Sequence, residues 1–471
     1  MISIWPLKFR EATDGDILLA DDAGGFFRSN EAFLTRYASG ALTADDHTFL
    51  LSNGHAFRNE LDPAYLSFAY RWARRQSVRH ELSYVILVPT LRCNLTCDYC
   101  QVSRAPATAR GFDWTEETLA ATIAFLDRID SSALKIEFQG GEPLLRLDLL
   151  DAVRRFCRSR FSQSQFVVCT NLQNVTEEAW FFLASEDTFI STSLDGDRGT
   201  HQRQRTRSDQ STAEFFANLD HAIERFGPSK ISALPTIDVD RPPSSDTLIS
   251  AFANLGLTSI YLRPINYQGF ARRRGQADSG SLHRWSEYHS SFVEALIAYN
   301  FNNNAQLEEY YFSQCLRRVL RLDADNHVDL RNPSFLATDY IVVDYDGRFY
   351  PSDEARMLSR IGQVDLSVGN VKDGIDEVKV GQLNMASMNN FDPDCIHCVY
   401  QPFCGTDIVD DLSRYGRIDL RRAETWFCQR HLAVFDKVFE LLYRQDAATR
   451  HSLAHWAGIQ DWPEGIVSRH I

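Results

Sequence analysis

Three features are missing from the 471-residue sequence, and each absence narrows the function. No apolar run approaches the ~20 residues needed to span a bilayer, so no membrane association is expected. The first ten residues, MISIWPLKFR, lack the charged-then-apolar order of a secretory signal, so we expect a cytoplasmic, reducing location. Basic residues are not in excess: 49 Lys and Arg stand against 63 Asp and Glu, and a net charge of −14 argues against general nucleic-acid binding.

The composition is that of a soluble globular protein with several domains. Hydrophobic residues make up 44% of the chain and charged residues 24%, which is ordinary for this class. At ~150 residues per domain, the length corresponds to about three domains. We find no internal repeat and no low-complexity tract. The pattern predicts an α/β protein in four segments, residues 1–60, 61–82, 83–300 and 301–471.

The first segment, residues 1–60, has the pattern of a small separate unit. Short strands are expected at residues 7–10, 15–20 and 26–28. Two helices follow, over 31–37 with Asn30 as N-cap and over 43–53. Strands and helices in so few residues indicate a winged-helix-like unit with a three-stranded sheet, which leaves a backbone edge open. The aromatic and Arg-rich stretch 61–82 is expected to be a helical connector.

Residues 83–300 alternate strand-like apolar runs with amphipathic stretches of helical length. Six strands are expected, at 84–88, 134–138, 165–169, 189–193, 230–234 and 259–263. Helices are expected near 115–129, 147–160, 176–185, 212–226, 246–254 and 282–299. Six βα units with largely apolar strands predict a parallel sheet covered by helices. In such folds the chemistry lies at the carboxyl ends of the strands.

Residues 301–471 are less regular. A hairpin is expected over 341–350, around Asp346 and Gly347. A helix over about 420–443 is expected to close the segment.

Ten cysteines carry most of the functional information. In a large chain without an export signal, clustered thiols indicate metal binding rather than disulfides. Seven of the ten fall in two groups. We expect the three scattered ones to be small buried hydrophobic residues; they are Cys157, Cys169 and Cys315.

The first group, Cys93, Cys97 and Cys100, follows the first strand of the βα series. Three thiolates within eight residues can hold three irons of a cubane cluster and leave the fourth iron open. An open metal position is what a catalytic site needs. A zinc ion that takes a fourth ligand from elsewhere is the alternative.

The Cys-x3-Cys-x2-Cys spacing, with Tyr99 before the last cysteine, resembles the radical S-adenosylmethionine (SAM) superfamily. The resemblance implies a partial (β/α)6 barrel over 83–300, a SAM-binding [4Fe–4S] cluster and a 5′-deoxyadenosyl radical that abstracts a substrate hydrogen. It places SAM contacts at successive strand ends: Gly140, Gly141, Glu142 and Pro143 near the methionine amino group, Asn171 and Ser193 near ribose or carboxylate, and Arg205 at the carboxylate. Gln202 departs from the family, which usually has Asp there.

The second group consists of Cys395, Cys398, Cys404 and Cys428. Four thiolates can fully ligate a second cubane cluster, and a four-cysteine zinc site remains the alternative. The arrangement resembles the C-terminal SPASM domain of radical SAM enzymes that modify peptides and proteins. The family's other auxiliary cluster is not expected, because Ser352 and Ile408 stand where it usually has cysteines. The resemblance therefore implies two [4Fe–4S] clusters in total.

The whole chain resembles the radical SAM maturases of the His-Xaa-Ser system, with related cyclophane-forming enzymes. The stretches that prompt this are Trp5–Arg10 and Tyr350–Glu354. The resemblance implies a precursor peptide with a leader as substrate, a side-chain crosslink as product, and an external electron donor such as flavodoxin or ferredoxin. Residues 1–60 would then bind the leader as an added strand, or only cover the barrel. Oxidation, epimerisation and a non-catalytic metal-binding peptide scaffold remain alternatives.

Asp353 is a candidate general base. Crosslinking removes a proton as well as a hydrogen atom, so a base beside the substrate would help. Asp353 follows the predicted hairpin, where relatives place cluster ligands or acidic groups. An exposed turn aspartate is the alternative.

Overall fold

The computed structural model describes most of the chain. The described residues are 2–76, 81–266, 268–274, 280–323, 327–444, 446–460, 462–463 and 465–470. Helix α3 (Pro63–Arg75) occupies the expected connector, of which residues 77–80 lie outside the described part.

A seven-stranded sheet forms the centre of the molecule. Its strands, in spatial order, are β12 (Ile231–Leu234), β11 (Thr188–Ser193), β10 (Gln163–Cys169), β9 (Ala133–Gly140), β6 (Tyr84–Thr90), β17 (Tyr340–Val343) and β18 (Phe349–Tyr350). All neighbouring pairs are parallel except the β17–β18 hairpin. Parallel pairing brings the carboxyl ends of β6 and β9–β12 to one edge, as the βα pattern predicts.

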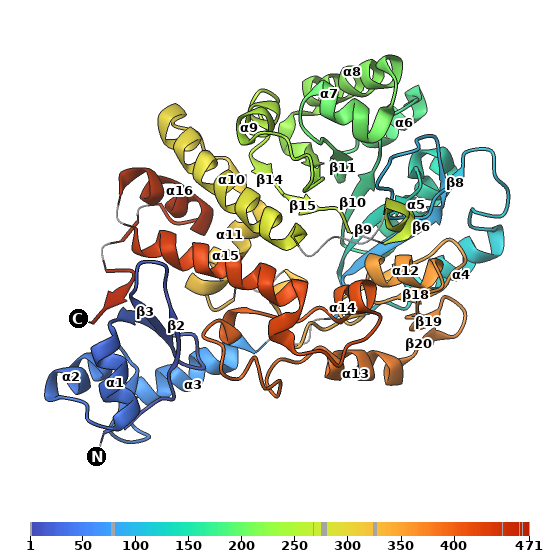
Figure 1. Ribbon diagram of the computed structural model, residues 1–471. Helices are drawn as coiled ribbons and strands as arrows, with labels where there is room; N and C mark the ends of the chain where they lie inside the picture. The colour runs from blue at the N-terminus through green and yellow to red at the C-terminus, as the bar shows by residue number, and fades with distance from the viewer. Residues whose placement is uncertain are drawn as a thin grey trace.

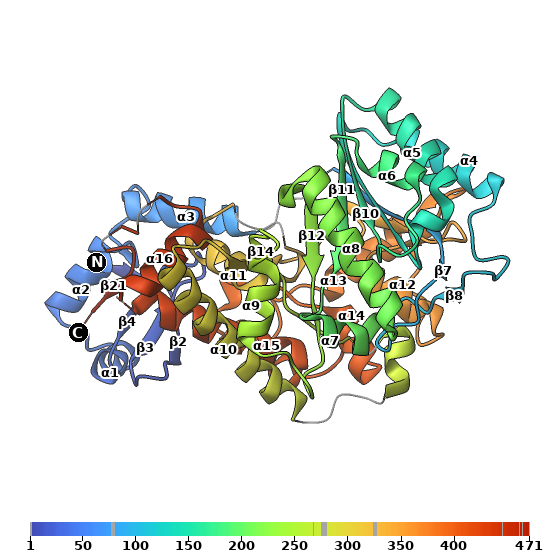
Figure 2. The same cartoon turned by 90° about the horizontal axis from the view of Figure 1, so that it is seen from above.

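Helices between the strands cover the sheet (Figures 1 and 2). They are α4 (Glu116–Asp127), α5 (Leu147–Arg160), α6 (Glu177–Leu183), α8 (Asp209–Phe226), α9 (Ser245–Ala253) and α10 (Ser281–Asn303). Four of them begin after a Ser or Thr whose side chain accepts a hydrogen bond from the first helical turn: Thr115, Thr176, Ser208 and Ser244. All six predicted helices are present, close to their expected positions.

The strand predictions need two corrections. The stretch 259–263 does not join the central sheet; it forms β14 (Ser259–Ile260), paired with β16 (Glu308–Glu309), and β15 (Arg263–Pro264), paired with β13 (Thr236–Ile237). The predicted hairpin over 341–350 does form, but its first strand pairs with β6 and extends the central sheet. The sheet therefore takes strands from both sides of the predicted boundary at residue 300.

The N-terminal unit packs tightly on the rest of the protein. Its sheet has the order β2 (Lys8–Glu11), β3 (Ile17–Ala20), β4 (Phe26–Ser29) and β21 (Ser468–Arg469). The fourth strand comes from the C-terminal end of the chain, so the expected three-stranded sheet is wrong. Both faces of β3 are buried: Leu18 and Ala20 join the main core, whereas Ile17 and Leu19 pack in a separate N-terminal core.

The remaining N-terminal elements complete that second core. They are β1 (Ser3–Ile4), α1 (Glu31–Ser39), α2 (Ala44–Ser52) and β5 (Ala56–Phe57). Asn30 caps α1 as predicted, because its side chain accepts from the Phe33 N–H at 2.9 Å.

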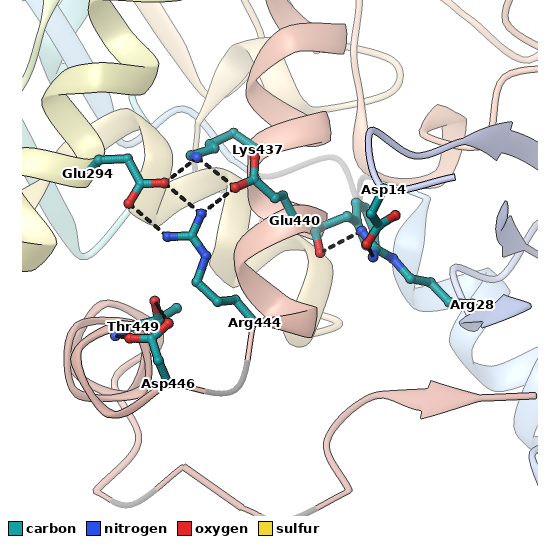
Figure 3. Close-up of polar contacts among 9 residues, drawn as sticks. Asp14, Arg28, Glu294, Lys437, Glu440, Arg444, Asp446 and Thr449 are labelled. Atoms are coloured by element: carbon teal, nitrogen blue, oxygen red, sulfur yellow. Dashed lines mark hydrogen bonds and ion pairs between the residues drawn. The ribbon is translucent and has the colours of Figure 1, made fainter. Parts of the chain in front are cut away.

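The C-terminal region is mostly helical. Its helices are α11 (Tyr310–Leu320), α12 (Asp353–Arg360), α13 (Glu377–Ala386), α14 (Ile408–Tyr415), α15 (Trp426–Tyr443) and α16 (Ala447–Ala457), with a short β19 (Gly369–Asn370) and β20 (Gly374–Ile375) pair. Glu294 of α10 accepts from both Lys437 and Arg444, which fastens this region to the barrel helices (Figure 3).

Candidate active site

A cavity of about 750 Å³ opens at the carboxyl ends of the central strands. Ten of the sequence-predicted site residues line it: Cys93, Cys97, Tyr99, Cys100, Gly140, Gly141, Asn171, Ser193, Arg205 and Asp353. The fold thus brings together residues that are spread over 261 positions, from Cys93 to Asp353. Glu142 and Pro143 are not among the lining residues.

The three thiols of the first group lie in this cavity on the loop after β6. Cys93 belongs to β7 (Arg92–Cys93), which pairs with β8 (Ala105–Pro106). Burial raises the pKa of Cys93 to about 12, and the neighbouring Cys97 and Cys100 contribute to this rise. Burial also raises the pKa of Cys97, whereas Arg205 opposes that rise. The donor set fits a cluster, because metal binding releases the thiol protons and three thiolates leave one iron open.

Gly140 and Gly141 are required by the cysteine loop itself. A Cβ on Gly140 would lie 2.2 Å from the Thr90 carbonyl oxygen, and one on Gly141 would lie 2.2 Å from that of Arg92. Gly140 also has a φ of +132°. The Gly141 N–H donates to Thr90 at 3.0 Å. We expected these glycines to let backbone approach a ligand; in the structure they let β9 approach the chain leading to Cys93.

Glu142 points into the protein rather than into the cavity. Its carboxylate accepts from the backbone N–H groups of Leu144 at 3.1 Å and Asn171 at 2.8 Å, and the residue is 1% exposed. Burial raises its pKa to about 7. Asn171 in turn donates to the Cys93 sulfur at 3.7 Å and to Asn94 at 2.7 Å. Glu142 therefore positions Asn171, and Pro143 begins the short helix η1 (Pro143–Arg146) behind it.

Arg205 is held at the cavity wall by a buried aspartate. Its Nε donates to Asp195 Oδ2 at 2.8 Å, and the Tyr99 hydroxyl donates to the same oxygen. The Arg205 guanidinium also lies 5.0 Å from the centre of the Tyr99 ring. Asp195 was not among the predicted site residues, although it lies two positions after Ser193. Asp195 fixes the guanidinium that the family resemblance assigns to the SAM carboxylate.

Asp353 faces the cavity while paired with a buried arginine. It opens helix α12, and Arg356 Nε donates to its carboxylate at 2.7 Å. Arg356 is fully buried and also pairs with Asp344 at 3.5 Å. The neighbouring Glu354 lines the cavity too, and burial raises its pKa. Asp353 is therefore not an exposed turn residue.

A second, smaller cavity of about 280 Å³ adjoins the first. Both are lined by Tyr261, Arg263 and Glu354. The smaller one also contains Asp407, whose pKa burial raises, and Arg430. These five residues come from five different elements or loops, so no local pattern in the sequence predicted the chamber.

The scattered Cys169 also reaches the first cavity. It lies at the end of β10, and its thiol donates to Glu137 at 3.2 Å. The groups that raise its pKa besides burial are Glu137 and Asp353, not the first cysteine group. Cys157 and Cys315 are buried, as expected.

The second cysteine group gathers between the loop after α13 and helix α15. Burial raises the pKa of Cys404, and so would negative charge on the nearby Cys395, Cys398 and Cys428 in their thiolate forms. The four cysteines therefore lie near one another. None of the four lines either cavity described above. Cys404 also contacts His431 Nδ1 at 3.1 Å. The donor set fits a fully ligated cluster. In the described ranges, no three His, Cys, Asp or Glu side chains converge on a single-ion site.

Comparison with known proteins identifies the central part of the chain. Residues 87–239 match the family model of the radical SAM superfamily. These residues form a radical SAM domain. The domain contains the first cysteine group, Gly140, Gly141, Asn171, Ser193 and Arg205.

Curated relatives of the radical SAM domain are similar over short stretches. An uncharacterized protein of Methanocaldococcus jannaschii is 30% identical over 117 residues, which cover 24% of this chain and 39% of that protein. The GTP 3′,8-cyclase of Erythrobacter litoralis is 33% identical over 129 residues, which cover 27% and 38%. The chain thus spans about two fifths of the length of the curated relatives it matches.

Solved structures resemble the fold beyond the radical SAM domain. Native anSMEcpe with bound AdoMet gives a TM-score of 0.59 at 17% identity, over 76% of this chain and 97% of that one. Streptococcus suis SuiB bound to precursor peptide SuiA gives 0.53 at 14% identity, over 91% and 100%. At these identities the likeness concerns the fold. Among the described helices, none has both the length and the apolar character needed to cross a membrane.

Proposed function

We propose that the protein is a radical SAM enzyme that modifies a ribosomally made precursor peptide, with a side-chain carbon crosslink of the cyclophane type as product. The observation that carries this proposal is the 750 Å³ cavity, in which three thiols, Arg205 and Asn171 meet at the strand ends of a radical SAM domain. The cavity is far larger than a cluster site requires, and so has room for SAM and a substrate side chain.

Each cavity residue has a role in this proposal. Cys93, Cys97 and Cys100 hold the SAM-binding [4Fe–4S] cluster, and Asp195 holds Arg205 toward the SAM carboxylate. When bound, the reduced cluster and SAM supply a 5′-deoxyadenosyl radical that abstracts a hydrogen atom from the substrate. Asp353 would accept the proton that crosslinking releases, and the auxiliary cluster of the second cysteine group would accept the electron that leaves with it.

The segments of the chain divide the remaining work. Residues 83–300 with β17 form the barrel, and residues 301–471 form a SPASM-like domain whose second group of cysteines holds one auxiliary [4Fe–4S] cluster. Residues 1–60 bind the leader of the precursor. The fold likeness to SuiB, which was solved with its precursor peptide, supports a peptide substrate. An external reductant such as flavodoxin or ferredoxin supplies electrons.

Product mass tests the proposal directly. The reconstituted enzyme is incubated anaerobically with SAM, a reductant and the short peptides encoded beside its gene. A crosslink lowers the peptide mass by two hydrogens, and fragmentation locates the two joined residues. The Cys93→Ala/Cys97→Ala/Cys100→Ala variant is the control and should leave the mass unchanged. A product one oxygen heavier would show that the enzyme hydroxylates the peptide instead of crosslinking it.

Epimerisation is the second candidate, because Cys169 offers a thiol in the same cavity. An epimerase must return a hydrogen atom to the substrate radical, and a thiol S–H can donate one; an electron from the external reductant and a proton from solvent would then restore the thiol. Epimerisation leaves the peptide mass unchanged but introduces one deuterium in D2O. Cys169→Ser should abolish deuterium incorporation if this candidate holds, whereas crosslinking should survive the substitution.

A further inference from the structure

The C-terminal strand of the chain completes the N-terminal sheet. In β21, Ser468 lies opposite Phe27 and Arg469 opposite Arg28, in parallel with β4. The His470 N–H continues this pattern and donates to the Arg28 carbonyl at 2.8 Å. Figure 2 shows β21 beside β4 and α2, at the end of the molecule away from the central sheet. The tail thus covers an edge that the first 60 residues alone would leave open.

The side chain of His470 occupies a shaped pocket. Its Nε2 lies 2.7 Å from Asp46 Oδ1, and its ring stacks on Phe49 with centres 4.4 Å apart. Phe33 meets the same ring edge-on at 5.3 Å. Asp46 is 1% exposed, and Arg36 keeps its pKa well below the usual range. The pocket therefore offers a fixed carboxylate, one stacking aromatic face and one perpendicular aromatic ring to a flat nitrogen ring.

The two residues before His470 also have their own partners. The Ser468 hydroxyl donates to Asn53 at 2.8 Å, and Arg469 pairs with Asp16 at 2.9 Å. Backbone pairing at a sheet edge combined with successive side-chain sites is how proteins bind extended peptides. The groove between β4 and the end of α2 therefore has the chemistry of a peptide-binding site.

The backbone pairing of the tail is short. Two residue pairs form the ladder, and the Arg469 side chain is 46% exposed, so its ion pair contributes little. The Tyr443 hydroxyl also donates to the Ser468 carbonyl at 2.9 Å, and Val467 packs on the main core. The opposite edge of the sheet is less accessible to a peptide, because Arg10 of β2 pairs with Asp436 of α15 at 2.6 Å. Of the two edges, the one under β21 is the one that a competing strand could take.

We propose that β21 occupies the peptide groove of the N-terminal unit in the resting protein, and that the leader of the precursor displaces it. The identity of this partner rests on the proposed function. The pocket specifies the leader's chemistry: an extended segment with an imidazole where His470 now lies, and a hydroxyl two residues before it. Because the tail is tethered, it competes at an effective concentration of about millimolar.

A peptide with the sequence of residues 462–471 tests this exchange without knowledge of the precursor. The probe carries fluorescein, and its binding to the full-length holoenzyme is followed by anisotropy. The His470→Ala enzyme should bind it at least about tenfold more tightly than the wild type, because its own tail competes less. A probe with its histidine replaced by alanine should bind neither protein. His283→Ala, which changes an exposed histidine on α10, should behave as the wild type.

A second variant removes the possibility that the tail simply stays in place. Ser468→Pro/His470→Ala also deletes a backbone donor, and hydrogen exchange at residues 26–29 reports whether β4 has become exposed. Faster exchange together with tight probe binding supports the proposal. Faster exchange with no probe binding overturns it, and so does slow exchange in both variants.

The precursor then separates this inference from the proposed function. A peptide that the enzyme modifies should displace the probe and show a lower KM with His470→Ala. If His470→Ala binds the probe more tightly but no peptide changes mass, the proposed function is wrong and the assignment of the peptide groove stands. If a peptide is modified but never displaces the probe, the groove assignment fails and the proposed function remains.

Discussion

The two cysteine groups differ in what surrounds them. Cys93, Cys97 and Cys100 line a cavity of about 750 Å³, together with polar groups from other strands, helices and loops. The four thiols of the second group line neither cavity, and one of them contacts His431. The first group faces space for a ligand, whereas the second faces neither cavity, and the thiols of both groups are partly exposed. A site in a ligand-sized cavity suits chemistry on a substrate, whereas a fully ligated site away from it suits electron transfer or structure.

Removing the first group should have the largest effect. With all three of its cysteines changed to alanine, iron content should fall from about eight to about four per chain, and 5′-deoxyadenosine should no longer form under reducing anaerobic conditions. Iron assay and chromatography measure both. Cys157→Ala, a buried thiol outside both groups, is the control. Continued SAM cleavage by the triple variant would contradict the assignment.

Removing the second group should separate cleavage from modification. Cys404→Ala should lower iron to about four per chain while SAM cleavage continues, because the second cysteine group lies outside the cavity. Peptide modification should fall strongly. Metal analysis of the wild type distinguishes the alternatives: about four irons with one zinc would favour a zinc site.

Asp353→Asn should lower product formation by about a hundredfold while SAM cleavage continues, because the amide cannot accept a proton. Loss of the charge opposite the buried Arg356 should also cost about 3 kcal/mol of stability. Single-turnover kinetics and thermal unfolding measure the two effects. Glu354→Gln is the neighbouring control; a larger loss of product there would move the role of base to Glu354.

Glu142→Gln should weaken SAM binding about tenfold without affecting iron content, because an amide nitrogen then faces a backbone N–H and Asn171 shifts. Calorimetric titration of SAM measures this. Burial raises the native pKa of Glu142 to about 7 from 4.5. The native state thus holds a proton that the unfolded chain releases, and its stability should fall as pH rises from about 4.5 to about 7. The variant should lack this slope in denaturant unfolding.

His431→Phe should have the smallest effect. The aromatic ring is kept, but the contact of Nδ1 with the Cys404 sulfur is lost, as is the contact of Nε2 with the Tyr311 hydroxyl. Loss of the hydrogen bond to the sulfur, of about 1 kcal/mol, should lower the reduction potential of the second cluster by on the order of 40 mV. Spectroscopic titration should show this shift for one cluster and none for the other. A shift in the first cluster instead would mean that the two groups are not separate.

Local features of the fold were predictable where the signal is local. Asn30 caps a helix as expected, since a side chain and the next helical turn suffice to form a cap. The Asp346–Gly347 hairpin also forms. The prediction that 259–263 forms a strand of the central sheet was wrong, because a short apolar run does not specify its partner strand.

The direction of side chains within the site was not predictable. Glu142 follows two glycines at a strand end, as a ligand contact would, yet its carboxylate caps η1 and holds Asn171. The contacts of Asp195 with Arg205 and of Glu137 with Cys169 join segments that are distant in the sequence, so no local pattern predicted them. These positions depend on contacts between residues far apart in the chain, which periodicity does not encode.

The sequence by itself determined the cysteine spacing, the alternation of strands and helices, and with them the radical SAM domain. Spacing within one loop and amphipathic period are set by neighbours along the chain. Only the tertiary structure decided that β17 extends the barrel sheet, that Asp353 faces the cavity, and that β21 closes the N-terminal sheet. A two-residue strand has no period of its own, so its place is fixed by the edge that receives it.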